Sequence, residues 1–408
     1  MQEHLARASL RVLAVLAVAA VATPPLVDAL ADTRRPAGDG ESVIRPAGGQ
    51  ASFTTVFPSP LGIEGLTGDG EGNLYSAGRG GDPCPVWRAR TSGGVATVVG
   101  TIPAPCSPSG IALDSAGDLF VADGDEVYTL TPDAADPPAA TVFAGGVPGA
   151  NGLAFDSRGD LWVSDGTTGQ GRVWRVGTDG APAEVFRIQP MVNEVNVVEG
   201  VGGVGRDPRS LPPGTVTVTP NGRSAANTAG SQHLVANGLA FAEDGTLYVA
   251  DTGRGAIWRI TFDQGGNLRS PVGCDTTFTP NTLCLDNVVV SHPYLEGADG
   301  IALDRGGNIW TAANERNAIV VASPQGRVLE FFRNPADEAT QLRNQGPLEF
   351  PTSPFLDGRT LCLAHSDGSR RDNFPSSGGE VGPSGPARAK ISCLDQPLAT
   401  QGMPLPVR

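Results

Sequence analysis

One short phrase recurs along this chain, and a recurring unit decides the architecture before any single motif does. Each copy has a polar residue, a glycine and an aliphatic residue, followed by a glycine-containing turn and a short strand with an aromatic residue. The copies begin at Glu64, Ser109, Asn151, Asn237 and Asp299. Four short β-branched and aromatic strands in each unit are typical of a propeller blade. The sequence therefore predicts an all-β propeller.

The number of copies predicts the number of blades. A sixth, weaker unit lies in residues 352–393, so we expect a six-bladed β-propeller. The interval between the third and fourth copies is much longer than the two before it, and residues 189–232 lack the phrase but carry Pro212 and Pro213. We interpret this segment as an insertion over the channel mouth. A seventh blade hidden in it is the alternative.

The predicted propeller covers residues 51–396, and its closure involves the N-terminal end of that range. A propeller avoids an exposed sheet edge when one end of the chain adds a strand to the blade made by the other end. The segment 51–56 suits that role. Residues 32–50, rich in Pro, Gly, Arg and Asp, are predicted to be a flexible leader, and residues 397–408 a C-terminal tail.

The first residues have the pattern of a secretory signal peptide. A basic Arg11 precedes an apolar run from Val12 to Ala22, which is too short to span a bilayer as a helix. The triplet 29–31 supplies the small residues that a signal peptidase needs, so residues 1–31 are predicted to be removed. Cleavage after Ala22 and an uncleaved anchor are the alternatives. We therefore expect a periplasmic or extracellular protein.

The six cysteines fall into couples that are close in sequence. An even number in an exported chain favours disulfides, although six cysteines allow fifteen pairings and free thiols remain an alternative. None has the spacing of a zinc or redox site. Pairing within each couple is the simplest arrangement: Cys84 with Cys106, Cys274 with Cys284, and Cys362 with Cys393.

The first residue of each repeat is predicted to line the central channel, because the first strand of every blade does so. These residues carry side-chain oxygens, and Glu64 and Asp299 add the two negative charges that balance a divalent cation. Asn, Asp and Ser before Gly are also ordinary turn residues, which is the competing interpretation. It does not explain Glu64, because Glu has no special turn chemistry.

These motifs resemble those of the gluconolactonase, senescence-marker-protein and luciferin-regenerating-enzyme family, and more distantly those of the paraoxonases. The resemblance covers about residues 52–396, and the segment 297–304 is similar to the family's Asp-Gly motif. It implies one divalent metal, calcium first, with zinc and manganese as alternatives. The implied ligands are Glu64, Asn151, Asn237 and Asp299. Ser109 falls in the second blade, where the family has no ligand.

The resemblance also implies hydrolysis of a lactone or related ester. Asp299 is the implied general base, although a carboxylate bound to a cation is a weaker base. His233, four residues before Asn237, is the other candidate for proton transfer. No arginine matches the family's contacts to sugar-lactone hydroxyls, so the substrate is not predicted beyond its class. The insertion 189–232 is either a lid that selects the substrate or an inert loop.

Two other function classes compete with a metal-dependent lactonase. One is a non-catalytic propeller in which the metal stabilises the channel and one face binds a ligand. The other resembles strictosidine synthase or virginiamycin lyase and acts without this ring of side chains. A net charge of -14 makes nucleic acid an unfavourable partner, and no membrane association is expected after signal cleavage. The string 200–205 fits G-x-G-x-x-G, but the prolines after it exclude the required helix.

Overall fold

The structure is a computed structural model that describes residues 44–47, 51–188, 236–274, 279–341, 343–368, 371–373 and 389–404. These ranges belong to one unit, Ser42–Arg408. Their regular structure consists of short strands and a few one-turn 3₁₀ segments. Within these ranges no helix has the length and apolar character needed to cross a membrane. The predicted signal peptide and the insertion 189–232 lie outside the described residues.

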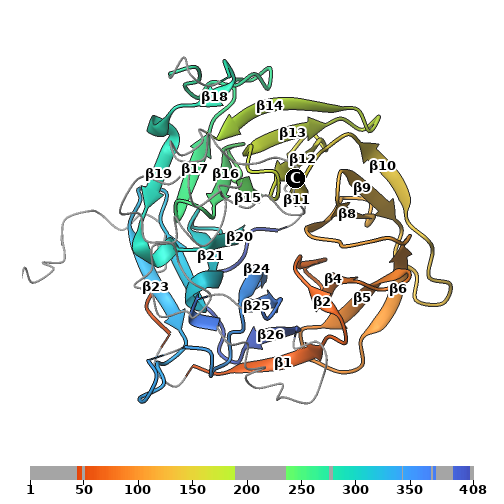
Figure 1. Ribbon diagram of the computed structural model, residues 1–408, viewed down its shortest axis with the longest axis vertical. Coiled ribbons are helices and arrows are strands. Elements are labelled where there is room, and N and C mark those ends of the chain that lie inside the picture. The colour runs from red at the N-terminus through yellow and green to blue at the C-terminus, as the bar shows by residue number, and fades with distance from the viewer. Residues whose placement is uncertain are drawn as a thin grey trace, which may run out of the picture. The chain divides into compact units, whose positions relative to one another are not determined.

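Six small sheets surround a common centre, as Figure 1 shows, and each sheet is one blade. Blade 1 contains β2 (Gly62–Ile63), β3 (Thr67–Gly68), β4 (Asn73–Arg79), β5 (Cys84–Arg90) and β6 (Thr97–Ile102). Blade 2 contains β7 (Ile111–Leu113), β8 (Leu119–Asp123), β9 (Glu126–Leu130) and β10 (Thr141–Gly145). Blade 3 contains β11 (Ala150–Phe155), β12 (Leu161–Asp165), β13 (Arg172–Val176) and β14 (Pro182–Ile188). The six-bladed propeller predicted from the repeat is confirmed.

The remaining blades follow the same antiparallel order. Blade 4 contains β15 (Ala236–Phe241), β16 (Leu247–Asp251), β17 (Ala256–Ile260) and β19 (Val288–Ser291). Blade 5 contains β20 (Ala298–Leu303), β21 (Ile309–Ala313), β22 (Ala318–Ala322) and β23 (Val328–Arg333). Blade 6 contains β24 (Pro351–Asp357), β25 (Thr360–His365) and β26 (Lys390–Leu394), with β1 (Phe53–Pro58) as its fourth strand.

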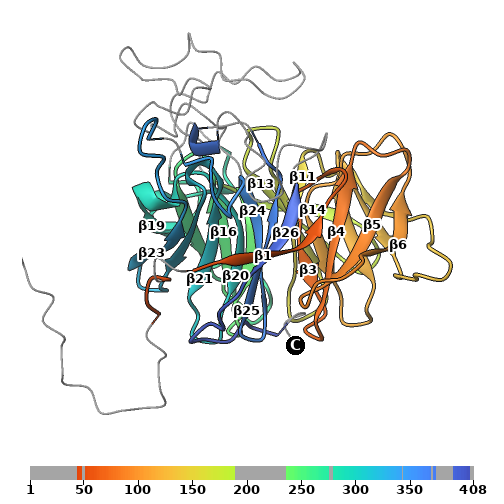
Figure 2. The same cartoon turned by 90° about the horizontal axis from the view of Figure 1, so that it is seen from below.

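The N-terminal strand closes the ring, as the sequence predicted. β1 pairs antiparallel with β26, from Phe53 opposite Leu394 to Pro58 opposite Lys390. Figures 1 and 2 both show β1 (orange) beside β26 (blue). The two ends of the described chain therefore share one sheet, with β1 as its outer strand, and this pairing closes the ring.

All three predicted disulfides are present: Cys84–Cys106, Cys274–Cys284 and Cys362–Cys393. The last one joins directly opposed residues of β25 and β26, with 4.0 Å between the two Cα atoms. It therefore ties the two middle strands of the closing blade, as expected.

The core lies between neighbouring blades. Trp162 of blade 3 packs against Phe241 of blade 4 with ring centroids 5.6 Å apart, and Phe57 of blade 6 packs against Trp87 of blade 1 at 5.1 Å. Each of the five tryptophans is buried. Aromatic side chains on successive strands thus hold the blades together through the interfaces between them.

Two features of the fold were not predicted. Between β17 and β19, the chain makes an excursion whose strand β18 (Thr282–Leu283) pairs parallel with β14 of blade 3. At the C-terminal end, Met403 N donates to Leu303 O at 3.0 Å and Gly402 N donates to Gly358 O at 2.7 Å. The described part of the tail therefore packs on blades 5 and 6.

Candidate metal centre

The four residues expected to bind a metal line one small cavity between the blades. Glu64 follows β2, Asn151 lies in β11, Asn237 in β15 and Asp299 in β20. All four line a cavity of about 70 Å³, together with the glycine that follows each of them. Asn151, Asn237 and Asp299 are buried, and each keeps less than a tenth of its surface exposed. The sequence repeat is thus brought to one point by the fold.

Three of the four candidate ligands lie in β-bulges within strands and not in turns. Asn151 and Gly152 together face the single residue Ser164, since Ala150 pairs with Asp165 and Leu153 pairs with Val163. The same shift occurs at Asn237 in β15 and at Asp299 in β20. A bulge re-aims a side chain without ending the strand. The turn interpretation of these Asn-Gly and Asp-Gly pairs is therefore wrong for these three blades.

The repeated glycine is required by close packing between blades. A Cβ on Gly238 would lie 2.6 Å from Asp299 O, and one on Gly300 would lie 2.5 Å from Thr352 O. Gly110 N donates to Asn151 O at 2.9 Å, which joins blade 2 to blade 3 in the same way. Each glycine thus lets the backbone of the next blade approach, and this brings the side chains that precede the glycines close together.

Polar neighbours orient Asn237 and Asp299, two of the four candidate ligands. Asn237 Nδ2 donates to Thr252 Oγ1 at 3.2 Å, and Thr252 Oγ1 donates to Ala298 O at 2.6 Å. Because the two ends of a carboxamide point in opposite directions, Asn237 Oδ1 is directed away from Thr252. Asn314 Nδ2 donates to Asp299 Oδ2 at 2.8 Å, with Asn314 itself buried. Contacts of this kind fix the donor atoms of a metal site before the ion binds.

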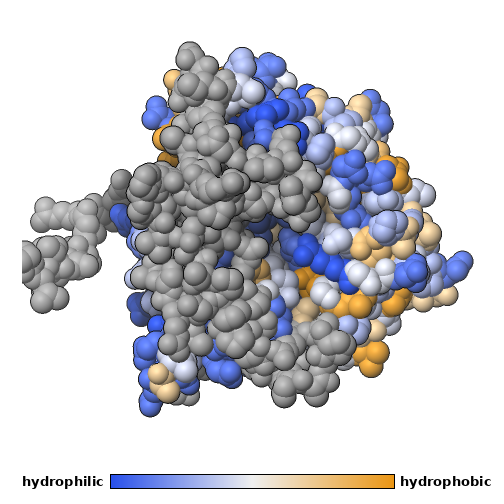
Figure 3. Space-filling view, viewed as in Figure 1, coloured by the Kyte–Doolittle hydropathy of each residue, from blue (hydrophilic) through white to orange (hydrophobic). Residues whose placement is uncertain are grey.

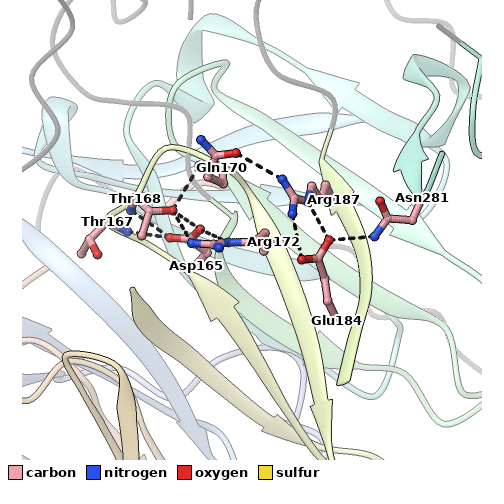
Figure 4. Close-up of polar contacts among 8 residues, drawn as sticks. All are labelled: Asp165, Thr167, Thr168, Gln170, Arg172, Glu184, Arg187 and Asn281. Atoms are coloured by element: carbon pink, nitrogen blue, oxygen red, sulfur yellow. Dashed lines mark hydrogen bonds and ion pairs between the residues drawn. The ribbon is translucent and has the colours of Figure 1, made fainter. Parts of the chain in front are cut away.

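A polar network in blade 3 supports Asn151. The buried Asp165 accepts hydrogen bonds from Thr168 N at 2.8 Å and from Arg172 Nε at 3.0 Å. These contacts hold the loop after β12, in which Gly166 lies directly against the Asn151 side chain. Figure 4 shows this network and its continuation to Arg187, and Figure 3 shows hydrophilic residues gathered over β13 and β14.

The outer part of the network ties blade 3 to the excursion of blade 4. Arg187 Nε donates to Glu184 Oε1 at 2.6 Å, and Asn281 Nδ2 donates to the same oxygen at 2.8 Å. The guanidinium hydrogen bonds lower the pKa of Glu184 against the effect of its burial. This side of the blade is therefore crosslinked by charge-assisted hydrogen bonds.

Arg79 is a component of the site that the sequence analysis missed. Its guanidinium forms an ion pair with Glu64 Oε2, while Asn151 Nδ2 donates to Glu64 Oε1 at 3.1 Å. Arg79 Nε also donates to Pro108 O at 2.7 Å. Burial lowers the pKa of Arg79, and the negative charges of Asp299 and Asp123 oppose that shift. A signal was available, since blades 2 to 4 end their second strand in Asp whereas blade 1 ends in Gly78 and Arg79.

The other polar candidates lie away from the cavity or outside the described residues. Ser109 is buried, and its Oγ donates to Ala150 O at 3.0 Å, which is a structural role in blade 2. His365 is fully buried in blade 6 against Ser392. His292 accepts from Tyr294 N in a 3₁₀ turn. His233 and the glycine string 200–205 lie outside the described residues.

The donor atoms present fit a hard divalent cation. Two carboxylates and two carboxamides converge on the cavity, and calcium takes six to eight oxygen ligands of these kinds. Four protein side chains would leave coordination positions for water and for substrate. The set offers neither nitrogen nor sulfur, which zinc prefers. Over the described residues, no cluster of three or more His, Cys, Asp and Glu side chains is arranged to hold a metal.

Comparisons with known proteins agree with this architecture. Residues 196–347 match the family model described as the SMP-30/Gluconolactonase/LRE-like region. No curated protein sequence matches the chain. Solved structures with the same fold include a putative gluconolactonase (17% identity, TM-score 0.53, covering 88% of this chain and 96% of that one).

Two further structures are similar to the same degree. A luciferin-regenerating enzyme has 16% identity and a TM-score of 0.54, covering 86% of this chain and 97% of that one. The calcium-binding protein regucalcin from Agrobacterium tumefaciens has 16% identity and a TM-score of 0.54, covering 87% and 97%. Identities this low establish the fold alone. With the match of residues 196–347, they confirm the resemblance to the SMP-30/gluconolactonase/LRE-like family that the repeat motifs indicated.

Proposed function

We propose that this protein hydrolyses a lactone or a related carboxylic ester at a divalent metal, calcium first, held by Glu64, Asn151, Asn237 and Asp299. The observation that carries the proposal is that these four oxygen-bearing side chains, far apart in sequence, line one cavity. The family match supports the reaction class, because the family model is named for gluconolactonase.

The reaction requires that the carbonyl group is polarised and that water loses a proton. When bound, a divalent cation would draw electron density from the ester carbonyl oxygen and make a nearby water more acidic. Asp299 would accept the proton of the attacking water, and the hydrogen bond of 2.8 Å from Asn314 Nδ2 to its Oδ2 would orient it. Water adds to the carbonyl carbon, the ring C–O bond breaks, and the proton passes to the leaving oxygen. The product is a hydroxy acid.

Two residues are candidates for the base, Asp299 and His233. A carboxylate beside a cation has a lowered pKa and is a weaker base, so Asp299 is a better ligand than base when the metal is bound. His233 is the second candidate for proton transfer. The two assignments predict different values of kcat for an Asp299 variant at saturating metal. If Asp299 is the base, kcat falls, and if His233 is the base, kcat stays near normal.

The protein is proposed to act in the periplasm or outside the cell. Three disulfides are typical of proteins in an oxidising compartment. Proteolysis and mass measurement of the exported protein would identify its first residue and test the predicted removal of residues 1–31.

One experiment tests the function directly. The purified protein is assayed against a panel of lactones and aryl esters, with and without chelator, and after addition of calcium, manganese or zinc. We expect activity on at least one lactone, its loss on chelation, and its recovery with one of the metals. Metal binding without turnover of any substrate would instead favour a non-catalytic propeller. Activity that survives complete removal of metal would contradict the proposed mechanism.

A further inference from the structure

Arg79 brings a positive charge next to the candidate metal centre, because it pairs with Glu64, one of the residues that line the cavity. It ends β4 in blade 1 and pairs with Glu64 Oε2. About a third of its side chain is exposed, with 33% of the surface accessible, whereas Glu64 keeps 14%. The Arg79 side chain is therefore only partly buried beside Glu64.

Only part of the hydrogen-bonding capacity of Arg79 is used within the described residues. Nε donates to Pro108 O, and Nη2 contacts Glu64 Oε2. A guanidinium carries five N–H groups in a rigid plane, and the Nη1 group has no partner among the described side chains and backbone. The guanidinium is thus held through Nε and Nη2, and its Nη1 group can donate to a ligand.

The net charge of the site indicates which charge a ligand at Arg79 should carry. Glu64 and Asp299 each contribute -1 and Arg79 contributes +1, so the three side chains together carry -1. A divalent cation would change this sum to +1. It would also draw Glu64 toward itself, which would weaken the contact between Glu64 and Arg79 and release further guanidinium donors. The loaded site would then have an excess positive charge with a planar fork at its edge.

We infer that Arg79 binds a carboxylate group of the ligand beside the candidate metal centre, and this inference rests on the proposed function for the position of that ligand. Two parallel N–H groups of a guanidinium match the two oxygens of a carboxylate in geometry as well as in charge. Two sources supply this chemistry. One is a carboxylate substituent on the lactone, and the other is the acid that ring opening produces.

The test uses binding before turnover. The full chain is titrated calorimetrically with 4-hydroxybutyrate and with its neutral amide, with and without calcium, in parallel with Arg79→Gln, Arg79→Lys and a control, Arg259→Gln. Arg259 is an exposed residue of β17. We expect the parent to bind the carboxylate more tightly than the amide, and Arg79→Gln to weaken carboxylate binding by about tenfold or more.

The matched variants separate charge from geometry. Arg79→Lys keeps the charge but loses the fork, so we expect an intermediate loss. In both Arg79 variants amide binding should change much less than carboxylate binding, and Arg259→Gln should behave as the parent. Equal affinities of the parent for carboxylate and amide, or an unchanged carboxylate affinity in Arg79→Gln, would overturn the inference.

A second arm distinguishes the two sources of the carboxylate. A substituent source predicts that Arg79→Gln lowers kcat/KM much more for a ring-carboxylated γ-butyrolactone than for γ-butyrolactone itself. A product source predicts that it weakens inhibition by 4-hydroxybutyrate with both substrates. Calcium binding to the parent is measured separately. Calcium binding with an unchanged carboxylate affinity would refute only the role of Arg79, and Arg79-dependent binding without any metal affinity would refute only the metal site.

Discussion

Asn314 Nδ2 donates a hydrogen bond of 2.8 Å to Asp299 Oδ2, so a neutral, buried amide fixes the one carboxylate that is both a candidate ligand and the candidate base. Asn314 follows β21, the strand next to that of Asp299 in blade 5. The contact fixes the orientation of the Asp299 carboxylate within the blade.

We expect Asn314→Ala to weaken metal binding by about 10-fold to 100-fold, as loss of an outer-shell partner does at other metal sites. Calorimetric titration with calcium measures this. Asn308→Ala is the matched control, because Asn308 Nδ2 donates to Asp304 in the same blade at the other end of β20. Equal metal affinities in the two variants would show that Asn314 does not orient the site.

Asp299→Asn and Asn151→Ala should differ at saturating metal. The first removes a charge and the candidate base, so we expect both weaker metal binding and a fall in kcat of about a hundredfold or more. The second removes a neutral ligand, so excess metal should restore much of its activity. Near-normal kcat for Asp299→Asn at saturating metal would make Asp299 a ligand only. His233 would then be the next residue to substitute.

Gly238→Ala tests the close approach between blades 4 and 5. Its Cβ would lie 2.6 Å from Asp299 O and 2.7 Å from Ile301 N, both backbone atoms that cannot move independently. We expect a loss of unfolding free energy of about 2 kcal/mol or more, measured by urea denaturation. Gly145→Ala is the control, because a Cβ there would meet no atom within 4 Å. Similar stabilities for the two variants would refute this explanation of the repeated glycine.

His365 should make stability depend on pH. It is fully buried, its Nδ1 accepts from Glu349 N at 3.1 Å, and its Nε2 lies 2.8 Å from Ser392 Oγ. Burial, and then the charge of Lys390, hold the pKa of His365 well below its ordinary value. A ring nitrogen that accepts from a backbone N–H cannot also carry a proton, so the folded protein keeps this histidine neutral.

The sign of the effect follows from the proton count. Below about pH 6.5 the unfolded chain binds a proton at His365 that the folded protein excludes, so the free energy of unfolding falls as the pH drops. The slope contributed by this one group reaches about 1.4 kcal/mol per pH unit. Urea denaturation between about pH 5 and pH 8 measures it for the parent and for His365→Gln. Equal slopes in the two proteins would exclude His365 as the cause.

The fold was predictable because one sequence phrase recurs in successive blades. Five blades carry the same phrase with its glycine and a weaker sixth unit follows, so the blade count could be inferred. The closing strand followed from the need to cover a sheet edge, and the three disulfides from the sequence-close cysteine couples. The excursion with β18 could not, because its two-residue strand pairs in parallel across to another blade and leaves no periodic signal. Contacts of that kind depend on the assembled ring.

The candidate site was predictable in its residues and not in its geometry. A polar residue before glycine is compatible with a turn or a bulge, and only the ladder shift around Asn151 distinguishes them. Arg79 was missed for a different reason. Arg79 ends the second full strand of blade 1, whereas the predicted site was drawn only from residues expected to line the channel. The ion pair with Glu64 joins Arg79 to one of those residues.

Closure by β1 has a consequence for how the molecule is made. The pairing of Phe53 with Leu394 joins residues that are more than 300 positions apart, so it is among the most non-local contacts in the chain. During synthesis or export, β1 leaves the ribosome or the membrane early. It stays unpaired until β26, its pairing partner, has also emerged. The first blade strands can meet their neighbours locally, but the ring cannot be sealed from its beginning. A chain interrupted before β26 would keep every candidate metal ligand and still present two unsatisfied strand edges, which are the usual starting point for aggregation.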